Sequence, residues 1–244
     1  MKPFLLLGTR DEDAAADNEY AAFLAFTGLD PSRLHRVRME RRPLGPVDLD
    51  DWSGIFLGGG PFNASDPSAA KSVVQQRVEA ELRSLLDQVV ARDFPFLGAC
   101  YGIGVIGTHQ GGTVDRRYAE PISRVEVSLT CEGRADPLLA DLPGRFEAFV
   151  GHKEAIHDLP PGAVHLASST ACPVQAFRVG QHVYATQFHP ELDIEGLCTR
   201  IEVYKHAGYF EPDQVDTLQA MARAGQVVEP PKILTRFVRR YARD

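Results

Sequence analysis

The chain has no excess of positive charge. Its 244 residues carry 26 Lys and Arg against 33 Asp and Glu, which gives a net charge of -7 at pH 7. This balance excludes a general attraction to nucleic acid or to an anionic membrane surface, so we expect neither among the partners. Long apolar runs are also missing. The apolar start, residues 3–7, is too short for a membrane span or a signal peptide and is typical of a first β-strand.

Cysteine is scarce and unpatterned. The four cysteines, at positions 100, 131, 172 and 198, form no C-x-x-C pair and no disulfide-dense framework. This usage indicates a reducing, cytoplasmic location. His157, His165 and His182 lack metal-ligand spacing to one another or to the cysteines, so we expect no metal site. The glycine loop at 58–60 lacks the Lys-Ser/Thr of a P-loop and the G-x-G-x-x-G spacing, and no other pattern predicts a cofactor.

A Gly-x-Cys-x-Gly frame around Cys100 is the most informative stretch present. An apolar run over 94–97 meets Gly98-Ala-Cys-Tyr-Gly102, and a second apolar run follows that could begin a helix. This is the thiol counterpart of the nucleophile elbow. A position near a helix N-terminus predicts a lowered thiol pKa and therefore more reactive thiolate. Taken alone, the frame leaves open that Cys100 is simply a buried core cysteine.

A base and a carboxylate come near the other end of the chain. Residues 183–191 are strand-like up to Pro190, and His189 and Glu191 stand two apart, so an extended chain would project both the same way. A nucleophilic cysteine requires a base, and the base requires an orienting carboxylate. Cys100, His189 and Glu191 supply that set, because such sites assemble in space and need not be adjacent in sequence.

Strand and helix patterns alternate along the chain. Strands are expected over 33–40, 52–57, 122–129 and 145–150, helices over 14–27 and 69–92, and a hairpin over 174–179 and 182–186. Strand, helix, strand makes parallel βαβ units, which bind ligands at the carboxyl ends of strands. Arg36, Arg38, Arg41 and Arg42 fit a solvated edge strand, or alternatively a phosphate or partner contact.

Three motifs in order carry a family resemblance: Leu57-Gly-Gly-Gly-Pro61, Gly98-Ala-Cys-Tyr-Gly102 and Gln187-Phe-His-Pro-Glu191. Together, over residues 3–191, they resemble the class I (triad) glutamine amidotransferases, most of all the amidotransferase domain of GMP synthases. The resemblance implies an α/β fold with a doubly wound, mostly parallel sheet flanked by helices. It also implies that Cys100 attacks the side-chain amide of glutamine to give a γ-glutamyl thioester and ammonia. His189 would act as base and then acid, with Glu191 orienting it.

The resemblance extends to substrate contacts. It implies an oxyanion hole made by backbone N–H groups of Gly59 or Gly60 and of Tyr101. Gly151 and His152 fall where the family contacts glutamine, although a polar loop is the alternative. The chain departs from the family where Cys-x-Gly-x-Gln is usual, because Gly104 replaces the Gln. A glycine has no side chain to hold glutamine, so the substrate could be weaker-bound or different.

After Glu191 the sequence predicts three helices, over 192–207, 212–224 and 231–242. We therefore expect a domain over residues 1–192 and a C-terminal helical extension over 193–244 that packs on it or, as the alternative, docks to another subunit. No segment resembles a synthase half. Three functions remain open: supply of ammonia to a separate synthase subunit, stand-alone hydrolysis of γ-glutamyl compounds, or a regulatory homologue with weakened catalysis.

Overall fold

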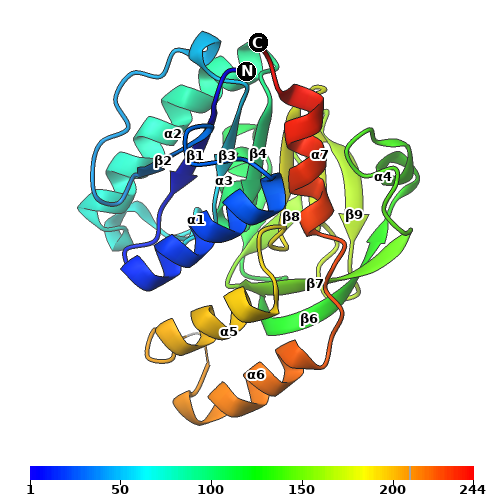
Figure 1. Ribbon diagram of the computed structural model, residues 1–244. Helices are drawn as coiled ribbons and strands as arrows, with labels where there is room; N and C mark the ends of the chain where they lie inside the picture. Colours follow the sequence, from blue (N-terminus) through cyan, green and yellow to red (C-terminus); the bar gives the residue numbers. More distant parts are fainter. Residues whose placement is uncertain (209) are drawn as a thin grey trace.

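A nine-stranded sheet in the order β2-β1-β3-β4-β11-β10-β9-β6-β7 organises the computed structural model, which describes residues 1–208 and 210–244 (Figure 1). Five neighbouring strands run parallel: β2 (Leu34–Arg38), β1 (Phe4–Gly8), β3 (Gly54–Leu57), β4 (Phe96–Ala99) and β11 (Val183–Thr186). The other four pair antiparallel: β10 (Ala176–Val179), β9 (Val164–Ser168), β6 (Glu120–Leu129) and β7 (Arg145–His152). A separate two-stranded sheet joins β5 (Thr113–Asp115) to β8 (Ala155–Asp158).

Helices cover both faces of the parallel half. Helices α1 (Asp13–Thr27) and α7 (Pro231–Tyr241) lie on the front face in Figure 1, and α2 (Val73–Ala91) and α3 (Tyr101–His109) lie behind. Successive strand residues face opposite sides, so Phe4 joins the apolar cluster under α1 and α7 while Leu5 joins the one under α2 and α3. The predicted doubly wound α/β fold is confirmed.

The structure corrects several predicted ends of helices and strands, for local reasons. The helix expected over 69–92 starts at Val73, because the Ser72 side chain accepts a hydrogen bond from the Gln75 N–H and caps it; a 3-10 turn over Ser68–Ala70 comes before. The strand expected to reach Pro190 ends at Thr186 and gives way to a turn. Helix α4 (Cys131–Ala135) and strands β8 and β9 were not predicted, since their segments are short and weakly patterned.

The C-terminal helices pack on the rest of the chain. Helices α5 (Ile194–Val203) and α6 (Val215–Arg223) share a small apolar cluster with Phe149 of β7. Helix α7 packs Phe237, which is fully buried, against both Phe4 and Phe56. The apolar side of α7 is therefore covered by its own chain, while the domain boundary at residue 192 stays a prediction.

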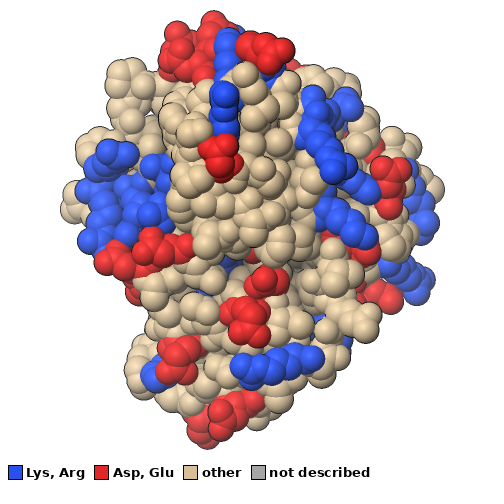
Figure 2. Space-filling view, in the orientation of Figure 1, with Lys and Arg blue, Asp and Glu red and all other residues tan. Residues whose placement is uncertain are grey.

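Three basic residues in β2 and just after it are ion-paired on the surface. Arg36 contacts Asp17 at 2.8 Å, and Arg41 contacts Asp13 at 2.9 Å. Arg38 is paired with Asp13 as well. This is the arrangement of a solvated edge strand. At the left of Figure 2 a group of basic side chains is bordered by acidic ones. None of the helices in the described residues is long and apolar enough to cross a membrane.

Candidate active site

Cys100 sits at a sharp turn between the end of β4 and the start of α3. Its backbone has φ 51° and ψ -96°, which is a strained conformation for a residue other than glycine. Its N–H donates to the Thr186 carbonyl at 2.8 Å, which ties it to the end of β11. A Cβ built on Gly98 would lie 3.1 Å from the Cα of Gly102, so the turn needs small residues there. The chain thus forms the predicted elbow.

His189 and Glu191 meet beside this elbow. His189 Nδ1 lies 2.8 Å from Glu191 Oε1, and both side chains are buried. They are brought together by the turn after β11, not by the extended chain that the sequence predicted. Gly59 lies between the imidazole and the cysteine: a Cβ there would be 2.6 Å from His189 Cε1 and 3.4 Å from Cys100 Cβ. The structure therefore gathers Cys100, His189 and Glu191 in one place.

A buried charge network surrounds the carboxylate, and its members were missed by the sequence analysis. Arg200 of α5 donates from Nη2 to Glu191 Oε1 at 2.9 Å, and its Nη1 lies 3.2 Å from His189 Nδ1. Arg200 also lies 3.6 Å from Glu19 of α1, which accepts from Arg10 Nε at 2.9 Å. Helix α5 therefore contributes directly to the surroundings of the site.

The protonation states differ from the thiolate that the elbow predicted. Burial raises the pKa of the Cys100 thiol to about 12, although Arg10 opposes this shift. Burial also lowers the pKa of His189, which favours the neutral ring. Burial opposes ionisation of Glu191, but His189 and Arg200 hold its pKa well below the usual range. An ionised Glu191 accepts a hydrogen bond from the Nδ1–H of His189, and this tautomer leaves Nε2 unprotonated to act as a base.

The glycine loop and Tyr101 both lie beside Cys100. Gly59 adjoins Cys100, and a Cβ on Gly60 would lie 2.0 Å from Thr9 Oγ1, so neither position has room for a side chain. Tyr101 is the first residue of α3, and the first N–H groups of a helix have no partner within it. These groups are therefore candidates to bind an anion, and their roles stay predictions.

The space beside Gly104 is filled by another side chain. A Cβ on Gly104 would lie 2.8 Å from Glu154 Oε1. The Glu154 carboxylate accepts from the N–H groups of Ala64 (2.7 Å) and Ser65 (2.8 Å), and so holds the loop that follows the glycines. A buried carboxylate thus stands where the family pattern would direct a glutamine side chain.

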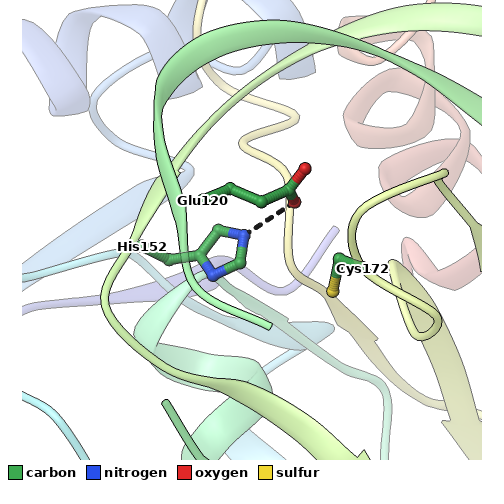
Figure 3. Close-up of side chains that lie close together, drawn as sticks. All are labelled: Glu120, His152 and Cys172. Atoms are coloured by element: carbon green, nitrogen blue, oxygen red, sulfur yellow. Dashed lines mark hydrogen bonds and ion pairs between the residues drawn. The ribbon is translucent and has the colours of Figure 1, made fainter. Parts of the chain in front are cut away.

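The side chain of His152 lies close to those of Glu120 and Cys172, and all three residues are buried (Figure 3). Its Nδ1 donates to the Glu154 carbonyl at 2.8 Å, and its Nε2 lies 2.9 Å from Glu120 Oε2. With Cys172 these side chains place ligand atoms within 4.8 Å of one another, a set that could hold a metal ion. Because both ring nitrogens of His152 are already engaged, its contacts with Glu120 and with the Glu154 carbonyl fix the 151–154 segment. A direct substrate contact by His152 stays a prediction.

The sequence held few signals for the missed residues. Arg10, Glu19 and Arg200 come from three separate segments, and nothing in their local patterns marks them. Glu154 comes two residues after His152, but only its distance from Gly104 reveals its place.

We expect Gly104→Gln to lower the free energy of unfolding by about 1–3 kcal/mol, because its side chain collides with Glu154. In a Glu154→Ala background the same change should cost less, since the carboxylate is gone. Chemical denaturation of the two single variants and the double variant measures this coupling. Additive losses would contradict a steric conflict between the two positions.

We expect Cys100 to alkylate slowly with iodoacetamide at about pH 8, and its rate to keep rising to about pH 10, because the thiol stays protonated there. Exposed Cys131 serves as the reference within the same molecule. Peptide mass spectrometry measures both rates. A Cys100 rate that levels off near neutral pH would instead support the thiolate that the elbow predicted.

Sequence comparison finds related amidotransferases. The model of the family described as glutamine amidotransferase class-I matches residues 34–197. The chain is 29% identical over 158 residues to a glutamine-hydrolyzing GMP synthase subunit from Methanoculleus marisnigri, covering 60% of this chain and 75% of that protein. It is 34% identical over 159 residues to the GMP synthase of Thermomicrobium roseum, covering 61% of this chain but spanning only 26% of that longer protein.

Structural comparison finds the same fold along the whole chain. A glutamine amidotransferase from Thermotoga maritima superimposes with a TM-score of 0.75 at 18% identity, covering 99% of this chain and 98% of that one. One from Methylobacillus flagellatus gives 0.73 at 21% identity, covering 100% and 97%. Since the family model spans well over half of the sequence, the chain belongs to the class-I glutamine amidotransferase family.

Proposed function

We propose that this protein hydrolyses the side-chain amide of glutamine through a Cys100 thioester. The observation that carries the proposal is the meeting of a strained, elbow-borne Cys100 with a buried His189 that is bonded to Glu191 at 2.8 Å. Nucleophile, base and orienting carboxylate are the parts that acyl transfer needs.

In the first half-reaction the Cys100 sulfur attacks the amide carbon while His189 Nε2 takes the thiol proton. Because the thiol and the imidazole are both neutral at rest, the proton moves from sulfur to Nε2 while the sulfur attacks. The oxyanion accepts hydrogen bonds from the N–H groups of Tyr101 and of Gly59 or Gly60, and such donors are worth about 3–4 kcal/mol each in comparable sites. The C–N bond then breaks as His189 returns the proton to the leaving nitrogen.

In the second half-reaction water replaces the amine. His189 takes a proton from water, the hydroxide adds to the thioester carbon, and the C–S bond breaks. The sulfur recovers its proton from His189, and glutamate leaves. Glu191 keeps the imidazole oriented and stabilises its charged form in both halves, which is why it must stay ionised.

Delivery of the ammonia to a separate synthase subunit is part of this proposal. Its support is the similarity to the GMP synthase subunit from Methanoculleus marisnigri, of which the chain spans 75%. A reducing cytoplasmic setting suits a free catalytic thiol. Stand-alone hydrolysis of a γ-glutamyl compound is the second candidate, and Glu154 beside Gly104 favours it, because the usual glutamine contact is replaced.

Ammonia release from glutamine by the purified chain tests the proposal, with Cys100→Ala as the matched control. We expect release that falls to background in the variant, because alanine has no thiol with which to form the thioester. Equal release by both proteins would overturn the role of Cys100. If neither protein releases ammonia, glutamine without a partner is not the substrate.

We predict that Arg200 positions the catalytic pair and tunes it. Its guanidinium lowers the pKa of His189, so Arg200→Ala should raise that pKa and move the acidic limb of the kcat/KM profile to higher pH. Arg200→Lys should restore the profile in part, because a cation remains. Arg178→Ala, which breaks an Arg–Asp136 pair away from His189, serves as the control. A purely structural role would lower activity at every pH without moving the limb.

A further inference from the structure

Cys100 lies between two hollows of different character. The polar hollow is bordered by Gly60, Cys100 and Gly151 together with Asn63, His152, Lys153, Glu154 and Gln187, and the aromatic residues Phe62 and Tyr101 also line it. The apolar hollow shares Gly60, Cys100 and Gly151 and adds the aliphatic side chains of Ile122, Val150, Leu192 and Leu197; polar side chains of Arg10, His189, Arg200 and Tyr204 complete its lining. A substrate attacked at Cys100 can therefore extend in two directions.

The polar hollow suits the γ-glutamyl half of a substrate. That half carries an ammonium and a carboxylate, and this hollow offers the Glu154 carboxylate, the N-terminal end of α3 and Gln187. Gln187 Oε1 is buried without a hydrogen-bond partner among the described residues, so it can accept a bond from a substrate N–H. Charged and hydrogen-bonding groups of the substrate thus find partners on this side.

The leaving amine belongs in the apolar hollow. His189 borders only this one of the two hollows, and under the proposed function it returns the proton to the leaving nitrogen. The nitrogen must therefore face His189 at the moment of bond cleavage. Whatever the nitrogen carries then points toward the walls formed by β6, β7 and the start of α5.

Those walls are larger and more apolar than ammonia requires. Ammonia is small and polar, so contact with four aliphatic side chains adds nothing to its binding free energy. An apolar group gains about 25 cal/mol of binding free energy for each Å² of apolar surface that it buries against them. Arg200, which also lines this hollow, has a buried Nε with no hydrogen-bond partner among the described residues. That N–H is a donor for an oxygen carried by the leaving amine.

We propose that the site prefers, over glutamine itself, a γ-glutamyl amide whose leaving amine is an amino acid or peptide with an apolar side chain. This inference rests on the proposed Cys100 chemistry. The bond that breaks is the isopeptide C–N bond. Cys100 forms the same γ-glutamyl thioester, and the amine leaves with the proton from His189. Water then releases glutamate, so no further reactant is needed.

The test compares kcat/KM for γ-glutamyl-leucine, γ-glutamyl-glycine and glutamine, with Cys100→Ala as the blank. We expect γ-glutamyl-leucine to exceed both of the others by about tenfold or more, since one or two buried methylenes are worth about 10–200-fold in discrimination. This comparison uses the unaltered protein and so does not depend on the folding of any variant.

A substitution in the apolar hollow then tests whether the preference for the leucine substrate arises there. Ile122 is only partly buried, so Ile122→Trp should fill the hollow at little cost to folding and lower the ratio of leucine to glycine substrate by about tenfold. Val125→Trp changes a partly buried residue of the same strand that does not border the hollow, and should leave the ratio unchanged.

Each outcome is decisive. Cys100-dependent cleavage of glutamine at least as fast as that of γ-glutamyl-leucine would overturn this inference and leave the proposed function standing. A ratio equally affected by Val125→Trp would remove the hollow as its source. Cleavage of none of the three compounds would overturn this inference, and it would restrict the proposed function to a chain that acts only with a partner subunit.

Discussion

The parallel pairing of β4 with β11 is the constraint on which the site depends. These strands are distant in sequence, yet their register sets Ala99 opposite Thr186, and the Cys100 N–H closes the ladder on the Thr186 carbonyl. Cys100 and the turn that carries His189 therefore emerge at the same edge of the sheet. Apolar side chains on both faces hold this pairing, so the packing of the core sets the geometry of the site.

Two positive and two negative side chains are buried together beside the catalytic pair. Arg10 and Arg200 face Glu19 and Glu191 in a buried group of four. A buried charge without a partner would be costly, and removal of one member exposes the others to that cost. The balance keeps Glu191 ionised and His189 neutral while Cys100 retains its proton. The resting site is thus poised for proton transfer without holding a free thiolate.

The sequence predicted the parts of the site that are local in the chain. Cys100 with its flanking glycines, and His189 with Glu191, each form a short motif whose chemistry follows from residue types and spacing. The residues that join the motifs could not be predicted in this way. Arg200 reaches Glu191 only because α5 packs beside the turn after β11. Glu154 approaches Gly104 only because the β7–β8 turn, which contains Glu154, lies beside α3. The thiol pKa was predicted wrongly for the same reason, since burial arises from packing and outweighs the helix end.

Arg200 belongs to a part of the fold that has a core of its own. Helices α5 and α6 are held by a small apolar cluster, separate from the two clusters of the main sheet. Units of this kind can open locally at a lower free energy than the whole protein needs to unfold. Because Arg200 moves with α5, such an opening would withdraw the cation from Glu191 while the elbow and the sheet stayed intact. The folded fraction and the catalytically competent fraction of this protein are therefore separate quantities.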